Sequence, residues 1–178
     1  MKPRDIFLGL IVIVIWGLNF IAIKIGLQDM PPLLLGALRF FFATFPVIFF
    51  LPRPPVAWRW LIALGLSINV GQFAFLFLGM KLGMPAGLAS LVLQAQAFFT
   101  LFAAALLLKE RWRRHHLIGL MIAAGGMSVI GAQQNGSMTV LGFWLTILAA
   151  ASWGLGNVIM RKATQNRPPF SMLSLVLW

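Results

Sequence analysis

IFLGLIVIVIWGLNFIAIK, residues 6–24, is the stretch of this sequence that decides the fold. It carries no charge before Lys24, and it is long enough to cross a bilayer core of about 30 Å as one helix of about 20 residues. A cleaved signal peptide has a shorter apolar region and a small-residue cleavage site after it. Because neither feature is present and more apolar segments follow, residues 1–25 are predicted to be retained as a membrane helix.

The rest of the chain is also strongly apolar. Of its 178 residues, 61% are hydrophobic and 10% are charged, whereas about a quarter of the residues of a typical soluble domain are charged. The apolar residues form long blocks and not an amphipathic pattern. Further spans are expected at residues 33–51, 60–80, 85–108, 117–132 and 140–160, and a seventh begins near Phe170 and stops at Trp178. The fifth is short, which leaves its boundary open. These lengths predict an all-α membrane protein folded as a helical bundle.

The distribution of the basic residues predicts the orientation in the membrane. A formal charge of +11 could suit nucleic acid if the charges shared one folded face, but they lie in short gaps between the apolar blocks. Eleven of the fourteen fall on one side: Lys2, Arg4, Arg53, Arg59, Lys109, Arg111, Arg113, Arg114, Arg161, Lys162 and Arg167. Because basic loops stay in the cytoplasm, we expect a cytoplasmic amino terminus in a bacterial inner membrane, and no nucleic-acid partner.

An internal repeat is visible in the sequence. Trp16-Gly17-Leu18 recurs as Trp153-Gly154-Leu155, and Pro31-Pro32 recurs as Pro168-Pro169, both at an offset of 137. With one residue of slippage, Asn19 and Lys24 match Asn157 and Lys162. Five spans separate the two copies, so the second copy enters the membrane from the opposite face and the repeats are inverted, as in many secondary transporters.

The repeat divides the chain into three parts. Residues 1–132 form a first five-span repeat, residues 133–139 form an outer loop, and residues 140–178 begin the inverted second repeat. Too few residues follow Pro169 for a seventh crossing, so the second repeat is expected to be truncated.

Residues that could support catalysis or metal binding are scarce. The three acidic residues, Asp5, Asp29 and Glu110, lie at span ends or in a loop, and the sequence has no cysteine. His115 and His116 are adjacent, so on a helix they point about 100° apart and do not share a face. We therefore expect no enzymatic activity, no metal site and no cofactor.

Polar side chains inside the spans are the candidates for a substrate cavity, because unpaired polar groups in the membrane are costly and tend to face a bundle interior. Pairs spaced three or four residues apart share a helix face, so two consecutive helices could line one cavity. The alternative is hydrogen bonding between helices, worth about 0.6 kcal/mol per contact. The candidates are Asn19, Asn69, Gln72, Ser90, Gln94, Gln96 and Asn157, with the mid-span Trp16 and Trp153 as walls.

Arg39 is the sharpest single candidate. It lies seven residues past Pro32, about 10 Å along a helix, where its guanidinium remains charged and can hold a carboxylate with two hydrogen bonds. The alternative is that the long side chain reaches back to the outer interface.

Four segments of the sequence form a recognisable set: Trp16-Gly17-Leu18-Asn19-Phe20 with Lys24, Leu38-Arg39-Phe40, the fourth-span run PAGLASLVLQAQAFFT at 85–100, and Lys109-Glu110-Arg111. Together they resemble the EamA family of the drug/metabolite transporter superfamily, which has Gly-Glu-Arg in place of the last of them. The resemblance implies a ten-span protein of two inverted five-span repeats, with a cavity between them and transport by alternating access. Within the family, the fourth-span segment points to export of cysteine, O-acetylserine and related zwitterionic metabolites.

Two other functions stay open. Export of drugs or organic cations usually needs a carboxylate inside the membrane, which this sequence lacks. A non-transporting membrane protein would also fit a truncated chain. The sequence does not identify the coupling ion, and it leaves the oligomeric state open, with a homodimer among the options.

Overall fold

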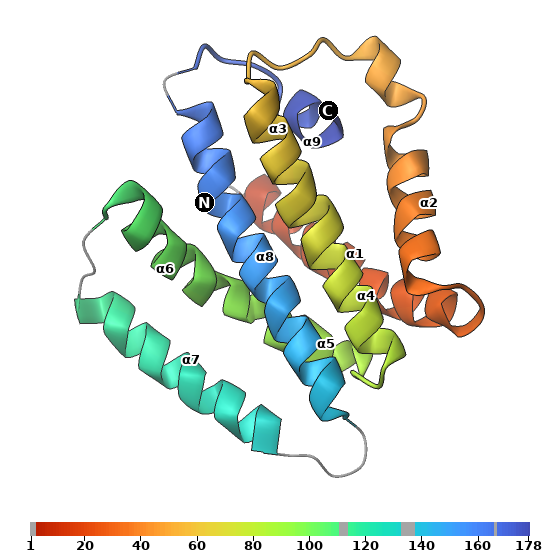
Figure 1. The fold of residues 1–178 in the computed structure, drawn as a ribbon, viewed down its shortest axis with the longest axis vertical. Coiled ribbons are helices and arrows are strands. Elements are labelled where there is room, and N and C mark those ends of the chain that lie inside the picture. Colours follow the sequence, from red (N-terminus) through yellow and green to blue (C-terminus); the bar gives the residue numbers. More distant parts are fainter. Residues whose placement is uncertain (1–2, 111–113, 133–137, 166) are drawn as a thin grey trace.

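The computed structural model describes residues 3–110, 114–132, 138–165 and 167–178, and within these ranges the regular structure is helical (Figure 1). Five helical segments are long and apolar enough to cross a membrane: Pro3–Asp29, Pro32–Phe50, Trp58–Lys81, Ala86–Leu108 and Val140–Thr164. The remaining predicted span lies in helix α7 (Arg114–Ala132), whose apolar part, His116–Ile130, is shorter. The predicted all-α membrane fold is therefore confirmed.

Most spans consist of more than one helical element. The first is one helix, α1 (Pro3–Asp29), and the second is α2 (Pro32–Thr44) followed by the short 3₁₀ helix η1 (Val47–Phe50). The third span contains α3 (Trp58–Leu64), η2 (Gly65–Gln72) and α4 (Phe73–Lys81), and the fourth contains α5 (Ala86–Val92), η3 (Leu93–Ala95) and α6 (Gln96–Leu108). After α7 follow α8 (Val140–Thr164) and α9 (Met172–Leu177).

Proline and glycine set several of these boundaries. Pro46 separates α2 from η1, because proline has no N–H to donate and its ring clashes with the preceding turn. The span predicted at 33–51 is thus two pieces. Pro85 precedes α5, where a missing N–H does no harm, and Gly83 supplies the positive φ of +105° that the turn after α4 requires.

The third and fourth spans both change their winding near the middle. Element η2 is a π-helix, with hydrogen bonds from residue i to i+5, and η3 is a short 3₁₀ turn. Such irregular backbone inside a membrane span is typical of helices that line binding sites or cavities. Both irregularities lie in the part of the fold that α8 contacts.

Helix α8 is the central element, and it packs against α4, η2 and α6 (Figure 1). Small residues permit this close packing. A Cβ atom added to Gly154 would lie 2.5 Å from the Cβ atom of Phe99, and one added to Gly156 would lie 2.2 Å from Cγ1 of Ile68. The sequence predicts that α8 begins a second repeat, and its packing partners α4, η2 and α6 belong to the predicted first repeat.

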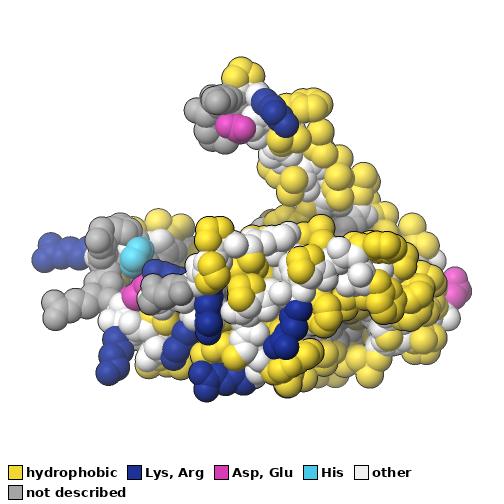
Figure 2. Space-filling view, turned by 90° about the horizontal axis from the view of Figure 1, so that it is seen from above, with side chains coloured by type: hydrophobic (Ala, Val, Ile, Leu, Met, Phe, Trp, Pro, Cys, Tyr) yellow, Lys and Arg dark blue, Asp and Glu magenta, His cyan; other side chains and the backbone are white. Residues whose placement is uncertain are grey.

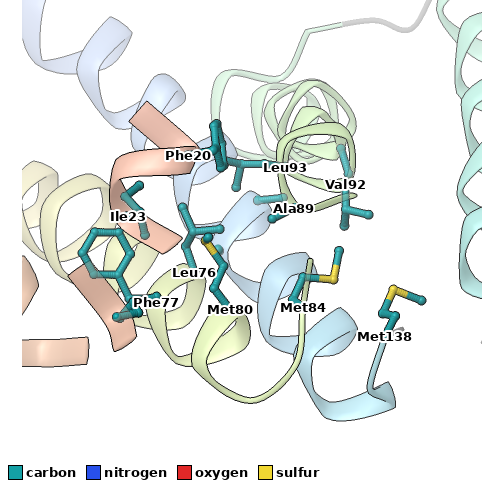
Figure 3. Packing of buried hydrophobic residues seen from close by; sticks show 14 residues of the cluster. Phe20, Ile23, Leu76, Phe77, Met80, Met84, Ala89, Val92, Leu93 and Met138 are labelled. Carbon is teal, nitrogen blue, oxygen red and sulfur yellow. The ribbon is translucent and has the colours of Figure 1, made fainter. Parts of the chain in front are cut away.

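The main core lies where α1, α4 and α5 meet, beside α8 (Figure 3). Phe20 and Ile23 of α1 point toward Leu76 and Phe77 of α4. These side chains are at most 4% exposed. Because the core joins residues of α1, α4, α5 and α8, it fixes the carboxyl-terminal half of α1 against the bundle.

Two parts of the fold lie at its periphery. The amino-terminal half of α1 projects from the body as an apolar arm with a charged tip (Figure 2), and each described residue from Pro3 to Leu18 is exposed. Helix α7 lies beside α6 (Figure 1). An apolar groove of about 400 Å³ is lined by Phe98 of α6, Leu120 and Met127 of α7, and Phe143 of α8.

Candidate functional site

Trp16 and Trp153 lie next to each other near the middle of α1 and α8. Their rings meet edge to face, with centroids 5.8 Å apart and an interplanar angle of 86°. This geometry is one of the favoured arrangements of aromatic pairs. The two tryptophans that correspond in the sequence repeat are therefore direct neighbours in the structure.

A cluster of three polar side chains joins α8 to α6; we call it the amide cluster. Asn157 Nδ2 donates to Gln96 Oε1 at 2.8 Å and to Thr100 Oγ1 at 3.1 Å. Thr100 Oγ1 in turn donates to the Gln96 carbonyl at 2.8 Å. Gln96 of α6 and Asn157 of α8, both predicted as cavity residues, thus form a direct hydrogen bond with each other.

Gln72 ends η2 and is 5% exposed. Its Oε1 atom is buried and has no hydrogen-bond partner among the described residues. Buried acceptors normally have a partner, because leaving one unpaired costs about 1–3 kcal/mol. In contrast, Ser67 at the other end of η2 donates to the Ala63 carbonyl at 2.7 Å. Gln72 is therefore a polar group in the bundle interior that can accept a hydrogen bond from a ligand.

Arg39 lies on α2 with its guanidinium carbon 4.5 Å from the centre of the Phe73 ring. The side chain is partly buried, and its Nη1 atom is buried with no hydrogen-bond partner in the described part of the chain. A guanidinium over an aromatic face is held by a cation–π interaction that leaves its N–H groups available. Sequence reasoning found Arg39 but not Phe73, because an aromatic residue in an apolar span gives no sign of its neighbours.

A cavity of about 190 Å³ separates α2 from the third span. Pro32, Gly36 and Phe40 line it on one side, and Asn69, Phe73 and Phe77 line it on the other. Phe73 thus presents its ring to Arg39 and also forms part of the cavity wall. Asn69, one of the predicted cavity candidates, is the polar side chain of this lining.

The structure does not bring all predicted residues together. Ser90 donates to the Gly87 carbonyl of its own helix at 2.7 Å, and Gln94 lines the groove between α6 and α7 with His116 and Ala123. The shared cavity predicted for the polar faces of the third and fourth spans is therefore not formed by these pairs. Asn69 and Gln72 lie within the π-helix η2 and Gln94 lies within the 3₁₀ turn η3, where the winding differs from the regular α-helix assumed in the prediction.

The opposite ends of the bundle are held by different contacts. At one end Lys81 donates to the Leu27 carbonyl, which satisfies a free carbonyl near the end of α1. At the other end Arg161 of α8 pairs with Glu110 at 2.7 Å, and both side chains are exposed.

Asn19, the remaining predicted residue, is partly buried three positions after Trp16.

Comparison with known proteins agrees with this architecture. The model of the EamA-like transporter family matches residues 4–132. The chain belongs to this family. A probable amino-acid metabolite efflux pump of Salmonella typhimurium is 52% identical over 100% of the chain and 60% of the relative, and one of Escherichia coli K12 is 48% identical with the same coverage. An uncharacterized transporter of Bacillus subtilis is 30% identical over 99% of the chain and 60% of its own length. No solved structure matches.

The chain is thus a member of a family of multi-pass membrane transporters and not of an enzyme family. The chain spans about three fifths of the length of these curated relatives. In the described ranges, no three histidine or carboxylate side chains lie close enough to hold a metal ion.

Proposed function

We propose that this EamA-family chain forms part of a secondary transporter that exports small zwitterionic amino-acid metabolites, of the cysteine and O-acetylserine class, from the bacterial cytoplasm. One observation carries the proposal: two buried polar atoms, Nη1 of Arg39 and Oε1 of Gln72, have no hydrogen-bond partner among the described residues. The first is a donor with a positive charge and the second is an acceptor.

This pair complements the two ends of an amino acid. The Arg39 guanidinium matches a carboxylate, which it can hold with short charge-assisted hydrogen bonds. Gln72 Oε1 can accept from an ammonium group. Phe73 follows Gln72 in the chain and lies under the Arg39 guanidinium. A bound zwitterion would satisfy both atoms and remove the penalty of leaving them unpaired.

The adjacent cavity has room for a small side chain. Its volume is about 190 Å³, and its lining is mainly apolar with Asn69 as a polar group. An engineered apolar cavity of about 150 Å³ in another protein is large enough to bind benzene. The side chains of cysteine and O-acetylserine are of this scale or smaller, which supports a compact substrate over a bulky drug.

The mechanism we propose is alternating access across two inverted repeats, ten spans in all, with the amino terminus in the cytoplasm. Basic residues concentrate on the side proposed to be cytoplasmic, in agreement with the positive-inside rule. Rocking of one repeat against the other would expose the site to each side in turn. The 1–132 repeat, the 133–139 loop and the 140–178 segment remain the proposed organisation.

Transport of radiolabelled cysteine and O-acetylserine into inside-out vesicles tests the proposal. Three preparations are compared: this chain, this chain extended by the part of the Salmonella relative that it does not cover, and vesicles without either protein. We expect the extended protein to take up both substrates, and an excess of unlabelled O-acetylserine to compete with cysteine. Uptake of an organic cation in place of both amino acids, despite verified membrane insertion, would show that the substrate class is wrong.

A further inference from the structure

Two tryptophans at the start of the third span hold basic side chains against their indole rings. The Arg53 guanidinium carbon lies 4.1 Å from the centre of the Trp58 ring. Two cations approach the Trp60 ring, whose centre lies 5.5 Å from the Arg59 guanidinium carbon and 5.7 Å from Nζ of Lys162. All three distances fall within the range of about 6 Å over which an aromatic face attracts a cation. We call these five residues the basic–aromatic site.

The site joins two segments that are far apart in the sequence. Arg53 and the two tryptophans belong to the loop before α3 and to its first turn, whereas Lys162 lies in the last turn of α8. Trp60 packs against a small core in which Val56 is 3% exposed and Ala163 is 1% exposed. Because this core fixes the Trp60 ring, the cations of both segments meet at a defined position.

The loop before α3 is also held in place. Three of the five residues from 52 to 56 are proline, which restricts the backbone. Ser174 donates a hydrogen bond to the Pro52 carbonyl, and Arg53 Nη2 donates to the Val56 carbonyl at 3.4 Å. A charged side chain that is held before a ligand binds loses less entropy on binding.

No carboxylate within the described ranges forms an ion pair with these cations. Of the three acidic residues in the sequence, Glu110 pairs with Arg161 at 2.7 Å, Asp29 ends α1 at the opposite end of the bundle, and Asp5 lies in the first turn of α1. The two like charges on the Trp60 ring repel each other, so an anion that contacts both would be stabilised twice.

The position of the site in the fold is that of a membrane surface. Trp58 begins one apolar span, Trp58–Lys81, and Lys162 lies near the end of another, Val140–Thr164. Seen from this end of the bundle, Lys and Arg side chains gather along one edge (Figure 2). Trp58 is 54% exposed. Tryptophan is enriched at this depth, where lipid headgroups meet the hydrocarbon core.

We propose that the basic–aromatic site binds the phosphate of an anionic phospholipid such as phosphatidylglycerol. Arg59 offers two parallel N–H donors to a phosphodiester, and Lys162 adds a point charge from α8. Arg53 contributes a third positive charge on the neighbouring ring. The exposed Trp58 ring contacts the glycerol and the upper part of the acyl chains, because indole has an apolar body and a polar edge.

A phospholipid explains the arrangement better than its alternatives do. Retention of basic loops on one side of a membrane requires charge alone, and it does not account for two cations on one ring. A soluble phosphate compound is not concentrated at the depth of the headgroups and has no apolar part for Trp58. Basic clusters between spans are, in contrast, a recurring way to hold anionic headgroups. The inference depends neither on the substrate nor on which side of the membrane this end faces.

Native mass spectrometry measures the binding. The extended protein, purified in an uncharged detergent, is titrated with phosphatidylglycerol or with phosphatidylethanolamine of the same acyl chains, and the bound fractions give two dissociation constants. Because each basic residue near an anionic lipid adds a preference of about fivefold, phosphatidylglycerol should bind at least roughly tenfold more tightly. Equal dissociation constants for the two lipids would overturn the proposal.

Substitutions that remove charge locate the site. Arg59→Gln combined with Lys162→Gln should weaken binding of phosphatidylglycerol by roughly 10- to 30-fold, to the level of phosphatidylethanolamine. The exchange of Arg59→Lys with Lys162→Arg keeps both charges and should retain most of the preference. The matched control is Arg167→Gln, which removes an exposed arginine just beyond α8. An equal loss per charge in the control would mean that only the overall charge matters, and displacement of the lipid by an equal concentration of inorganic phosphate would assign the site to a soluble anion.

Thermal unfolding separates a lipid site from a purely structural one. In phosphatidylethanolamine, Arg59→Gln should leave the melting temperature unchanged or raise it, because it removes one of two like charges. Phosphatidylglycerol should raise the melting temperature of the unsubstituted protein, since a ligand stabilises the folded state that binds it, and Arg59→Gln should lose most of this rise. A variant that keeps the full rise, or that melts at a lower temperature by the same amount in both lipids, would contradict the proposal.

Discussion

Arg39 stacks on Phe73, with its guanidinium carbon 4.5 Å from the ring centre, and the same Phe73 lines the cavity between α2 and the third span. The stacking keeps the long side chain within the bundle, where it would otherwise extend toward the membrane interface. It also leaves the buried Nη1 atom available for a ligand. The position and the unpaired donor together favour a role in binding over one in topology.

Replacing Arg39 should therefore weaken substrate binding. A charge-assisted hydrogen bond contributes about 1.5–3 kcal/mol. In the extended protein, which is this chain with the part of the Salmonella relative that it does not cover, Arg39→Ala should therefore raise the KM for O-acetylserine by roughly 10- to 150-fold. Arg39→Lys keeps the charge but loses the planar fork, and an intermediate KM is expected. Initial uptake rates in vesicles give both values. Arg167→Ala, which removes an exposed arginine, is the matched control, and equal KM values for both alanine variants would refute the carboxylate role.

Replacing Gln72 should distinguish a role in transport from a role in stability. Its Oε1 atom is buried without a partner, so Gln72→Leu removes a polar group that the bundle itself does not satisfy. Such a replacement is expected to leave the free energy of unfolding unchanged or to raise it by about 1 kcal/mol, while transport falls. Thermal unfolding in detergent and vesicle uptake are measured on the same preparations. A large loss of stability would show that Gln72 is a structural residue with a partner in the complete protein.

The amide cluster should contribute modestly to stability. Interhelical hydrogen bonds in membranes average about 0.6 kcal/mol and reach about 1.7 kcal/mol. A double-mutant cycle of Gln96→Leu and Asn157→Leu should give a coupling energy in this range, because Asn157 Nδ2 donates directly to Gln96 Oε1 at 2.8 Å. Unfolding by denaturant in mixed micelles measures it. A coupling near zero, together with lost transport, would favour the cavity role that the sequence also allowed.

The sequence alone predicts those features that depend on one helix at a time. The length of each apolar block follows from the thickness of the bilayer, which is why the spans at 60–80, 85–108 and 140–160 correspond closely to helical segments in the structure. The repeat around Trp16 and Trp153 is likewise visible, because it requires only a shared offset. That the two tryptophans touch could not be read from the sequence.

The site depends on relations between helices, and there the sequence says less. Asn69 and Gln72 share a face only if the helix winds regularly, and the π-helix η2 separates them. The partners of Arg39 and Asn157, which are Phe73 and Gln96, come from other spans at angles set by small residues such as Gly154. A periodic pattern carries no information on such angles, so these residues could be predicted as candidates but not assembled into a site.

Substitution of the glycines of α8 should destabilise the protein much more than substitution of the glycines of α7. A Cβ atom at Gly154 or Gly156 would lie 2.2–2.5 Å from atoms of Phe99 or Ile68, so Gly156→Val should cost about 1–3 kcal/mol or prevent folding. Gly119→Val, with nothing within 4 Å, should be nearly neutral. Melting temperatures of the purified chains compare the two. Similar melting temperatures would mean that α8 is not packed as the structure has it.

The predicted orientation in the membrane can be tested without a transport assay. Asp29 ends α1 at the sparsely charged end of the bundle, and Gln165 follows α8 at the end that carries Arg161 and Lys162. If basic loops stay inside, Asp29→Cys should react with an impermeant maleimide added to intact cells, whereas Gln165→Cys should react only after the cells are permeabilised. The natural absence of cysteine makes each label specific. The reverse pattern would place the amino terminus outside and would reverse the proposed direction of every span, while labelling of both sites in intact cells would indicate two orientations of this chain.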